Sequence, residues 1–582
     1  MNAKRLMGAA LVGILLLTAC GKKVPSYTKY IPKDAGYVIA IDVQGMMGKL
    51  QKDSLSVDNV FEAFKDTSAD YAKAVSTWKD FKDAGIDFSN KVFIAISASG
   101  FGMMGGGSAS FEMVGGLKDA AKLEAFIKKQ PNFSEIKKGD GFSYTGENNM
   151  MIGWNDDAVI MVAMNENNFS NYPSVMGQTD STTMASPRSE SSTGTASEKL
   201  KKYFKLEEKE SLASISAFKD LMGKSADVAM YSSPSSSSLP SMLSASPKLK
   251  DLIDGIYSTT VVNFEDGKID MQSTGYLGDK LAELVKKYPS TDVDMGMVAN
   301  YPSSNVDGLV MFSFNPKILP EVIKEAGLDA LANIGLQSAG LNLDDVGSIF
   351  KGDFALVLSD LTMEKKMFGS FATTSPSVKV LFSAKIGNKA ALDKLIALGE
   401  KSGMIIRQGN SIVIANNGVP SPMPYAISLA NDAITVTSDS ALMTTYMAKT
   451  QKIGLPDDVS SKLKSTSMGT FVDFEKIFTG LGTSMFDSTD AEGKNIFTKA
   501  QATFKNGWFT AGNFDGKKSE SKGELVFEDA KKNSLSQIVN LAIYAAQQEK
   551  IKSAKQAAAY KMMDQNSNSM VDTTAAPQAA GQ

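Results

Sequence analysis

Val114-Gly115-Gly116-Leu117 opens a stretch that continues with Ala121, Leu123, Phe126 and Ile127. The first four residues are typical of a strand, and apolar residues spaced by three and four predict a short amphipathic helix packed on a sheet. The same pattern returns as Phe382-Ser383-Ala384-Lys385-Ile386, followed by Ala390, Leu392, Leu395 and Ile396. A strand with a covering helix that occurs twice predicts a chain built from two related halves.

Further pairs of segments support this duplication, in the same order and with a spacing of roughly 250–275 residues. Both halves also place Asp-Gly between strand-like runs, which predicts a hairpin because Asp-Gly accepts the positive φ of a type I′ turn. The pairs are Tyr37–Ile41 with Leu309–Phe314, Gly85–Phe88 with Gly340–Leu343, Gly139-Asp140 with Gly409-Asn410, Asp156-Asp157 with Asn431-Asp432, Asp266-Gly267 with Asp515-Gly516, and the closing helices Leu281–Tyr288 with Leu535–Ile543.

We therefore predict an α+β fold of two tandem related repeats, each made of antiparallel β-hairpins and sheets covered by helices. The repeats cover residues 30–290 and 295–550, and residues 551–582 are expected to form a polar helical extension and a tail that is disordered from Asp564. Tracts rich in serine, glycine and asparagine (165–197, 232–247 and 364–378) are expected to be surface loops. The alternative is two unrelated α+β domains that share a generic pattern.

The composition excludes many kinds of site. The 582 residues include no histidine and one cysteine, with 61 basic and 64 acidic residues. Imidazole relays and imidazole metal ligands are therefore excluded, and one thiol cannot form an intrachain disulfide or a thiolate metal cluster. Lysine supplies all but three of the cations, which disfavours bidentate recognition of phosphate or guanine. We expect no nucleic-acid partner, no metal and no cofactor.

The N-terminus has the features of an export signal. Basic residues at positions 4 and 5 precede a mostly apolar run from Leu6 to Thr18, which is too short to span a bilayer. The run ends in Leu17-Thr18-Ala19-Cys20, which resembles the lipobox of bacterial lipoproteins. By this resemblance, Leu17, Thr18 and Ala19 are recognised by the signal peptidase and Cys20 carries the lipid. We predict a signal peptide over 1–19 and a lipidated tether over 20–29; the alternative is a buried core cysteine.

The residues after the cysteine bear on location. Lipoproteins that Bacteroidota export to the cell surface usually carry acidic residues close behind the cysteine, whereas here Gly21-Lys22-Lys23 follows and the first acid is Asp34. This departure favours an outer-membrane lipoprotein that faces the periplasm over one exposed at the surface.

The segment Tyr30-Ile31-Pro32-Lys33-Asp34-Ala35 leads directly into the apolar run over 36–42. With the lipobox before it, this segment resembles an uncharacterised family of Bacteroidota lipoproteins that open with Ile-Pro-x-Asp-Ala and are known only as a domain of unknown function. The resemblance implies an envelope lipoprotein but no particular activity or site. Pro32 and Asp34 are expected to form the turn that leads into the first strand.

Residues 100–105 fit the pattern G-x-G-x-x-G, but the pattern is not followed by the helix that a dinucleotide site needs. We interpret the segment as a glycine-rich hairpin loop. Its Phe101, Met103 and Met104 are unusual for a solvated loop and are candidates for contact with a partner.

Three motifs resemble those of serine–lysine hydrolases, which work without histidine. They are Ser216-x-x-Lys219, Ser303-Ser304-Asn305 and Lys401-Ser402-Gly403. Serine and lysine are common here, and Lys401-Ser402-Gly403 ends a predicted helix rather than lying on a strand. The acidic pairs at 344–345 and 457–458 are expected to be helix starts, and the three tryptophans are expected to be packing residues rather than sugar platforms.

The sequence favours a membrane-anchored envelope lipoprotein that binds or scaffolds a partner without catalysis. The partner is a protein, a peptide or a glycan held between the repeats. Two alternatives remain: a hydrolase that uses lysine or carboxylates in the groove between the repeats, and a periplasmic chaperone or carrier for apolar cargo, suggested by 31 methionines.

Replacing the only cysteine tests the anchor. Cys20→Ser should move the protein from the membrane fraction to the soluble fraction, because no thiol remains to accept the lipid. The measurement is fractionation of cells followed by immunoblotting. An unchanged membrane fraction would contradict lipidation.

Overall fold

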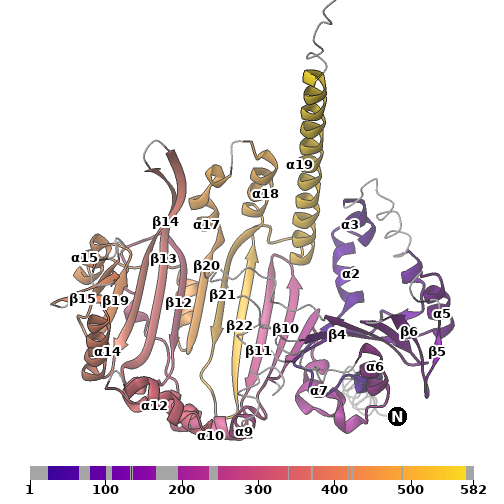
Figure 1. Ribbon diagram of the computed structural model, residues 1–582, viewed down its shortest axis with the longest axis horizontal. Helices are drawn as coiled ribbons and strands as arrows, with labels where there is room; N and C mark the ends of the chain where they lie inside the picture. The colour runs from indigo at the N-terminus through magenta and orange to yellow at the C-terminus, as the bar shows by residue number, and fades with distance from the viewer. Residues whose placement is uncertain are drawn as a thin grey trace, which may run out of the picture.

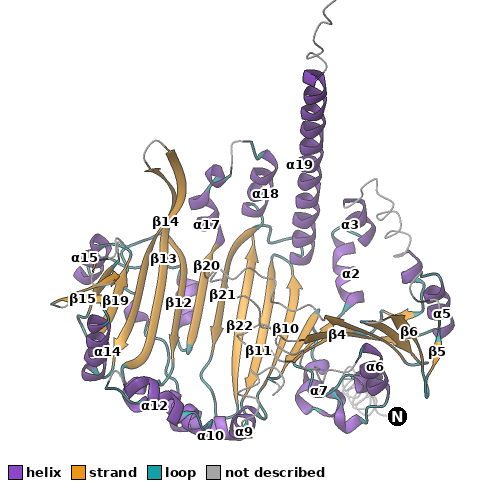
Figure 2. Cartoon of the chain, in the orientation of Figure 1, coloured by secondary structure: helices purple, strands orange, loops and turns teal. Residues whose placement is uncertain are grey.

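The computed structural model describes residues 24–571, except for 64–78, 100–107, 131–132, 134, 148, 166–194, 235–246, 338–339, 369–370, 410, 417–418, 421–424 and 487–488. The chain forms an α+β fold around a large antiparallel sheet, as predicted (Figure 2). Every strand pairing in the described part of the chain is antiparallel.

The first half of the chain supplies one side of this sheet. Its strands pair in the order β5-β6-β7-β8-β4-β3-β1-β9-β10-β11, and β2 pairs with β4. Their bounds are β1 Tyr37–Ile41, β2 Ile86–Asp87, β3 Val92–Ser99, β4 Ser108–Leu117, β5 Lys137–Lys138, β6 Ser143–Glu147, β7 Met150–Trp154, β8 Ala158–Asn165, β9 Val228–Ser232, β10 Tyr257–Glu265 and β11 Lys268–Tyr276.

The second half pairs in the matching order β15-β16-β18-β19-β14-β13-β12-β20-β21-β22, and β17 pairs with β16. The bounds are β12 Val306–Ser313, β13 Phe350–Phe368, β14 Phe371–Ile386, β15 Ile405–Gln408, β16 Ser411–Asn416, β17 Val419–Pro420, β18 Ala426–Ser428, β19 Ala433–Thr437, β20 Met468–Asp473, β21 Phe504–Ala511 and β22 Lys518–Phe527.

The two halves meet where β11 pairs with β22, from Lys268 opposite Val526 to Tyr276 opposite Lys518. The halves therefore share one sheet and one strand order. That the segments 30–290 and 295–550 are related repeats stays a prediction. The predicted correspondence between the Gly85 and Gly340 segments is not seen in their secondary structure. Gly85 precedes β2, whereas Gly340 precedes a helix.

Helices lie along two opposite edges of the molecule (Figure 1). We call α6, α7, α9, α10 and α12 the lower helix row, and α2, α3, α17, α18 and α19 the upper helix row. The helix bounds, including the short 3₁₀ helices η, are η1 Ser26–Tyr30, α2 Val43–Lys52, α3 Val57–Ala63, α5 Ala120–Lys128, α6 Ala196–Phe204, η3 Glu208–Glu210, η4 Leu212–Ser214, α7 Ser216–Gly223, α9 Pro247–Ile253, α10 Asp279–Lys287, η6 Met295–Met297, α11 Ile318–Glu325, α12 Asp329–Gln337, α13 Leu343–Ser348, α14 Lys389–Lys401, α15 Ser440–Ala448, α16 Asp457–Leu463, α17 Phe474–Leu481, η7 Thr483–Met485, α18 Ala491–Gln501 and α19 Ser534–Val571.

The strand-then-helix block forms as predicted in both halves. β4 leads into α5, where the Asp119 carboxylate accepts a hydrogen bond from the Lys122 N–H. β14 leads into α14, where the Asn388 side chain accepts one from the Ala391 N–H. Each cap satisfies a backbone donor that the first helical turn leaves free.

Each half has its own main hydrophobic core. In the first half, η1, α6 and α7 bury residues such as Tyr27, Leu200 and Phe218 against the sheet. In the second half, Phe471 of β20 and Leu309 of β12 are buried beside Leu463 of α16. Buried and more exposed residues alternate along β1, because successive side chains of a strand point to opposite faces of the sheet. Val38 and Ala40 face the core and are each 1% exposed.

Three sequence predictions are wrong in detail. Of residues 364–378, predicted as a surface loop, the described residues 364–368 and 371–378 extend the β13–β14 hairpin, with Thr362 opposite Ser377 and Phe368 opposite Phe371. α19 continues past Asp564 to Val571, where a disordered tail was predicted. The β10–β11 turn has positive φ only at Gly267 and not at Asp266, so it is not type I′. Contacts of the Gly267 backbone with Lys532 and Phe527 hold this turn from outside the hairpin.

No helix among the described residues combines the length and the apolar character needed to cross a membrane. α19 is long but carries polar residues throughout, and it packs against α18, α2 and α3. Its contacts with α18 include Gln548, Lys552 and Lys555, around the middle of the helix.

The core of the second half provides a stability test. Phe471→Ala should lower the free energy of unfolding by about 3–5 kcal/mol, because the buried ring leaves a cavity. Met468→Ala, on the same strand but 36% exposed, should cost about 1 kcal/mol or less. Urea denaturation followed by circular dichroism measures both, and equal losses would contradict the assigned core.

Candidate binding pocket at the junction of the two halves

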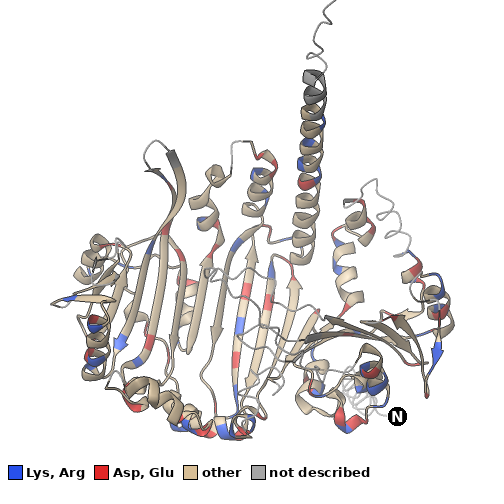
Figure 3. Cartoon of the chain, viewed as in Figure 1, with Lys and Arg blue, Asp and Glu red and all other residues tan. Residues whose placement is uncertain are grey.

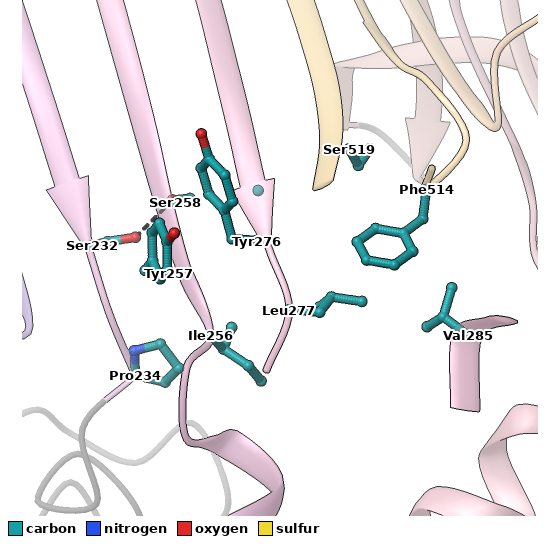
Figure 4. A pocket seen from close by; sticks show the side chains of 11 residues that line it. Ser232, Pro234, Ile256, Tyr257, Ser258, Tyr276, Leu277, Val285, Phe514 and Ser519 are labelled. Carbon is teal, nitrogen blue, oxygen red and sulfur yellow. Dashed lines mark hydrogen bonds between the residues drawn. The ribbon is translucent and has the colours of Figure 1, made fainter. Parts of the chain in front are cut away.

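An apolar pocket of about 340 Å³ lies where the two halves of the sheet meet (Figure 4). Residues at the ends of β9, β10 and β11 line it, together with Val285 of α10 and residues near β22. They are Ser232, Pro234, Ile256, Tyr257, Ser258, Gly275, Tyr276, Leu277, Val285, Phe514 and Ser519. No lysine, aspartate or glutamate is among these lining residues. The volume is at the small end of the roughly 300–1,000 Å³ typical of ligand pockets.

Stacked tyrosines form one wall of the pocket. Tyr257 and Tyr276 are opposite each other on β10 and β11, with ring centroids 4.4 Å apart and an interplanar angle of 20°. The Tyr231 ring stacks behind Tyr257 at 6.1 Å. The pKa of Tyr257 is raised, mainly because the side chain is partly buried and to a smaller extent because Tyr276 lies next to it. The tyrosine therefore presents a neutral aromatic face.

Gly275 leaves the pocket open. It lies on β11 between Ser258 and Ser519, which are its partners on the two neighbouring strands. A Cβ atom added at Gly275 would have no atom within 4 Å. The missing side chain therefore contributes to the free space.

Ionic contacts hold the strands beside the pocket together. Figure 3 shows charged residues of both signs along β11 and β22. Lys268 Nζ lies 2.6 Å from Glu524 Oε1, and the Trp508 indole N–H donates to Glu524 Oε2 at 3.0 Å. Burial opposes ionisation of Glu524, but these two hydrogen bonds lower its pKa overall. The carboxylate thus stays charged and links three strands, because Trp508 lies on β21.

A second candidate is a buried polar cluster beneath α6. Glu112 Oε1 accepts hydrogen bonds from Ser110 and Tyr203, and Lys199 donates to Ser110 at 2.8 Å. Ser110 and Glu112 are each 1% exposed, so a substrate cannot reach them in this conformation. Glu112 Oε2 makes no hydrogen bond within the described part of the chain. Burial raises the pKa of Glu112 more than the two hydrogen bonds lower it.

A third candidate is a polar pocket of about 230 Å³ in the second half. Lys385 lies in it between Asp294 and Asp353, so its charge is already balanced. Among the residues that the structure describes, no group of three histidine, cysteine, aspartate or glutamate residues could hold a metal ion.

The structure brings few of the sequence-predicted site residues together. Leu17, Thr18, Ala19 and Cys20 lie outside the described residues, as do Phe101, Met103 and Met104. Ser216 and Lys219 are exposed on α7, and Ser402 follows the end of α14, so neither belongs to a buried site. Trp154 is 2% exposed in a core, as predicted, and Trp508 is half-buried. Asp344 and Asp345 lie in the first turn of α13, and Asp457 begins α16, as predicted.

Sequence reasoning did not identify the junction pocket. Its residues come from strand ends and loops in both halves and from α10, and no sequence motif brings them together. The available signal was the alternation along residues 269–274 after the Asp-Gly hairpin, which indicated a half-solvated strand but not its partner.

A family model matches residues 27–174 of this chain. Its description is a domain of unknown function (DUF4836). The match is consistent with an uncharacterised family and covers the part of the first half from η1 to just past the end of β8. No curated protein matches the chain.

Two crystal structures of TP0453 are similar to parts of the chain. Crystal form I is 10% identical and covers 46% of this chain and 86% of its own, and crystal form III is 9% identical and covers 45% and 85%. The TM-score is 0.22 for both. Scores of this size do not establish a common fold.

The raised pKa of Glu112 predicts a pH dependence. The folded state binds this proton more tightly than the unfolded state, so the stabilisation is complete below about pH 4.5, the usual glutamate value, and is lost as pH rises through the raised pKa. Above about pH 4.5, the free energy of unfolding should fall with rising pH more steeply in the wild type than in Glu112→Gln.

Urea titrations at several pH values measure this difference. Glu124→Gln, a change at a carboxylate on α5 whose pKa is lowered by Lys128, should keep the wild-type loss of stability. If the free energy of unfolding of Glu112→Gln fell with pH as steeply as that of the wild type, the pH dependence would come from another group and the prediction would be wrong.

Proposed function

We propose that this protein is a lipoprotein of the bacterial envelope, anchored through Cys20 to the outer membrane with its body in the periplasm. In this proposal it acts as a binding or scaffold protein and not as an enzyme. The junction pocket receives an apolar group, such as an aromatic or aliphatic side chain of an envelope protein or peptide.

The observation that carries the proposal is the mostly apolar surface of the junction pocket, which no lysine, aspartate or glutamate lines. Stacked tyrosines, Ile256, Leu277, Val285 and Phe514 surround the space, and serines supply its polar atoms. An apolar group gains free energy there by leaving water, at roughly 25 cal/mol per Å² buried. A glycan is disfavoured, because its hydroxyl groups would lose water without enough new hydrogen bonds.

The hydrolase alternative finds no support at this pocket. It required a buried lysine or carboxylate pair facing the groove between the halves, and no such residue lines the pocket. The carrier alternative shares the apolar pocket. However, it predicted a large methionine-lined concavity, and no methionine lines this pocket.

Filling the pocket tests the proposal. Gly275→Leu should weaken binding of the apolar fluorophore N-phenyl-1-naphthylamine at least five-fold, because the new side chain occupies open space next to Ser258 and Ser519, which also line the pocket. Fluorescence titration measures the affinity, and circular dichroism confirms folding.

The control is Gly223→Leu at the end of α7, where an added Cβ likewise meets no atom within 4 Å. It should bind the probe as the wild type does. Cross-linking in envelope membranes should capture a partner with the wild type and with Gly223→Leu but not with Gly275→Leu. Equal binding by all three proteins would disprove the assignment of the pocket.

A further inference from the structure

We infer that the lower helix row lies against the lipid surface of the membrane, and that the exposed face of α12 contacts lipid as a second attachment beside the anchor. This inference rests on the proposed lipidation of Cys20. It adds an orientation and a named contact surface that the anchor alone does not provide.

The first argument is the short distance between the anchor and the folded body. The described chain begins at Val24, four residues after Cys20. Four residues reach at most about 14 Å when fully extended. η1 begins only two residues later and is firmly packed: Tyr27 is 3% exposed, and its hydroxyl donates to the Lys91 carbonyl at 2.6 Å. The lipid therefore holds this part of the body close to the bilayer.

The second argument is the position of η1 in the fold. η1 contacts η4, which in turn contacts α7, and Pro32 bridges to Ser211 just before η4. Tyr27 and Tyr30 of η1 share one core with residues of α6 and α7. Because α6 and α7 belong to the lower helix row (Figure 1), η1, where the described chain begins, lies on the side of this row, and we infer that the anchor four residues before Val24 does too.

The third argument is the surface of α12, in the same row. Leu331 is 67% exposed and Ile334 is 69% exposed. They are three residues apart and so share one face of the helix, whereas Leu336 packs towards a core. Asp329, at the first position, is the only charged residue of α12. Leu319 of the neighbouring α11 is 45% exposed and adds to the apolar surface.

A contact this small would be weak for a freely diffusing protein. Tethering changes this, because a second contact on an anchored body forms at a high effective concentration. The single anchor lies beside the first half, and α12 lies in the second half. The two attachments together therefore fix the orientation of a long molecule that one tether would leave free to turn.

This orientation has two consequences. The junction pocket, lined by Val285 of α10, lies towards the membrane side, so apolar ligands reach it from the lipid surface. α19, in the upper helix row, projects away from the bilayer, with Tyr560 and Met563 exposed on it (Figure 1).

The single cysteine makes a site-specific test practical. Lipidation consumes the sulfur of Cys20 as a thioether, so an introduced cysteine is the only free thiol in the full-length lipidated protein. We would label Leu331→Cys with the fluorophore NBD in phosphatidylcholine–phosphatidylethanolamine vesicles and add doxyl-labelled lipid as a quencher. The matched control is Met563→Cys on α19, at a side chain that is 66% exposed.

The expected result is a blue-shifted emission and at least three-fold stronger quenching at position 331 than at position 563. Protein that floats with vesicles but shows equal quenching at both positions would overturn the orientation while leaving the anchor intact. A blue shift at 331 without quenching would show a protein surface in place of lipid and would also overturn the inference. Lipidated protein that fails to float with vesicles would overturn the anchor, and this inference with it.

Discussion

The ladder between β11 and β22 is the interaction on which the rest of the structure depends. It runs over the full length of β11 and joins segments about 250 residues apart in the chain. Without it, each half would end in an exposed edge strand with a row of unpaired backbone groups. With it, the two strand orders join into one sheet, and the ends of β9, β10 and β11 meet Phe514 and Ser519 of the second half to form the pocket.

The ladder between β11 and β22 contains both unfavourable and favourable charge pairs. The like-charged Asp270 and Glu524 are opposite each other, which by itself is unfavourable. Lys268 offsets this by pairing with Glu524. Gly523 has no side chain where the Trp508 carbonyl, the Phe509 ring and Met271 approach, and a Cβ added at Gly275 would meet no atom within 4 Å. The same absence of bulk leaves the space that the proposed ligand uses.

Local patterns predicted much of the fold. The strand-helix blocks, the hairpins at both Asp-Gly turns and the helix starts at Asp344 and Asp457 depend on residues close in sequence, and these formed. Predictions failed where distant contacts decided the conformation. Residues 364–378 look like a loop by composition, yet backbone pairing in a long hairpin holds 364–368 and 371–378 extended. The buried Glu112 cluster combines residues from β4 and α6 that no spacing rule connects.

The sequence by itself determined the class of the fold, the order of its elements and the kinds of chemistry that the composition excludes, because these follow from residue type and short-range periodicity. Its lipobox also predicts the anchor. Only the tertiary structure decided that β11 pairs with β22, that the tyrosines and Phe514 line one apolar space, and that α6, α7 and α12 lie along the same edge of the molecule. Strand pairing across such separations depends on which edges and faces remain open after each half has folded, and this information is not contained in any single segment.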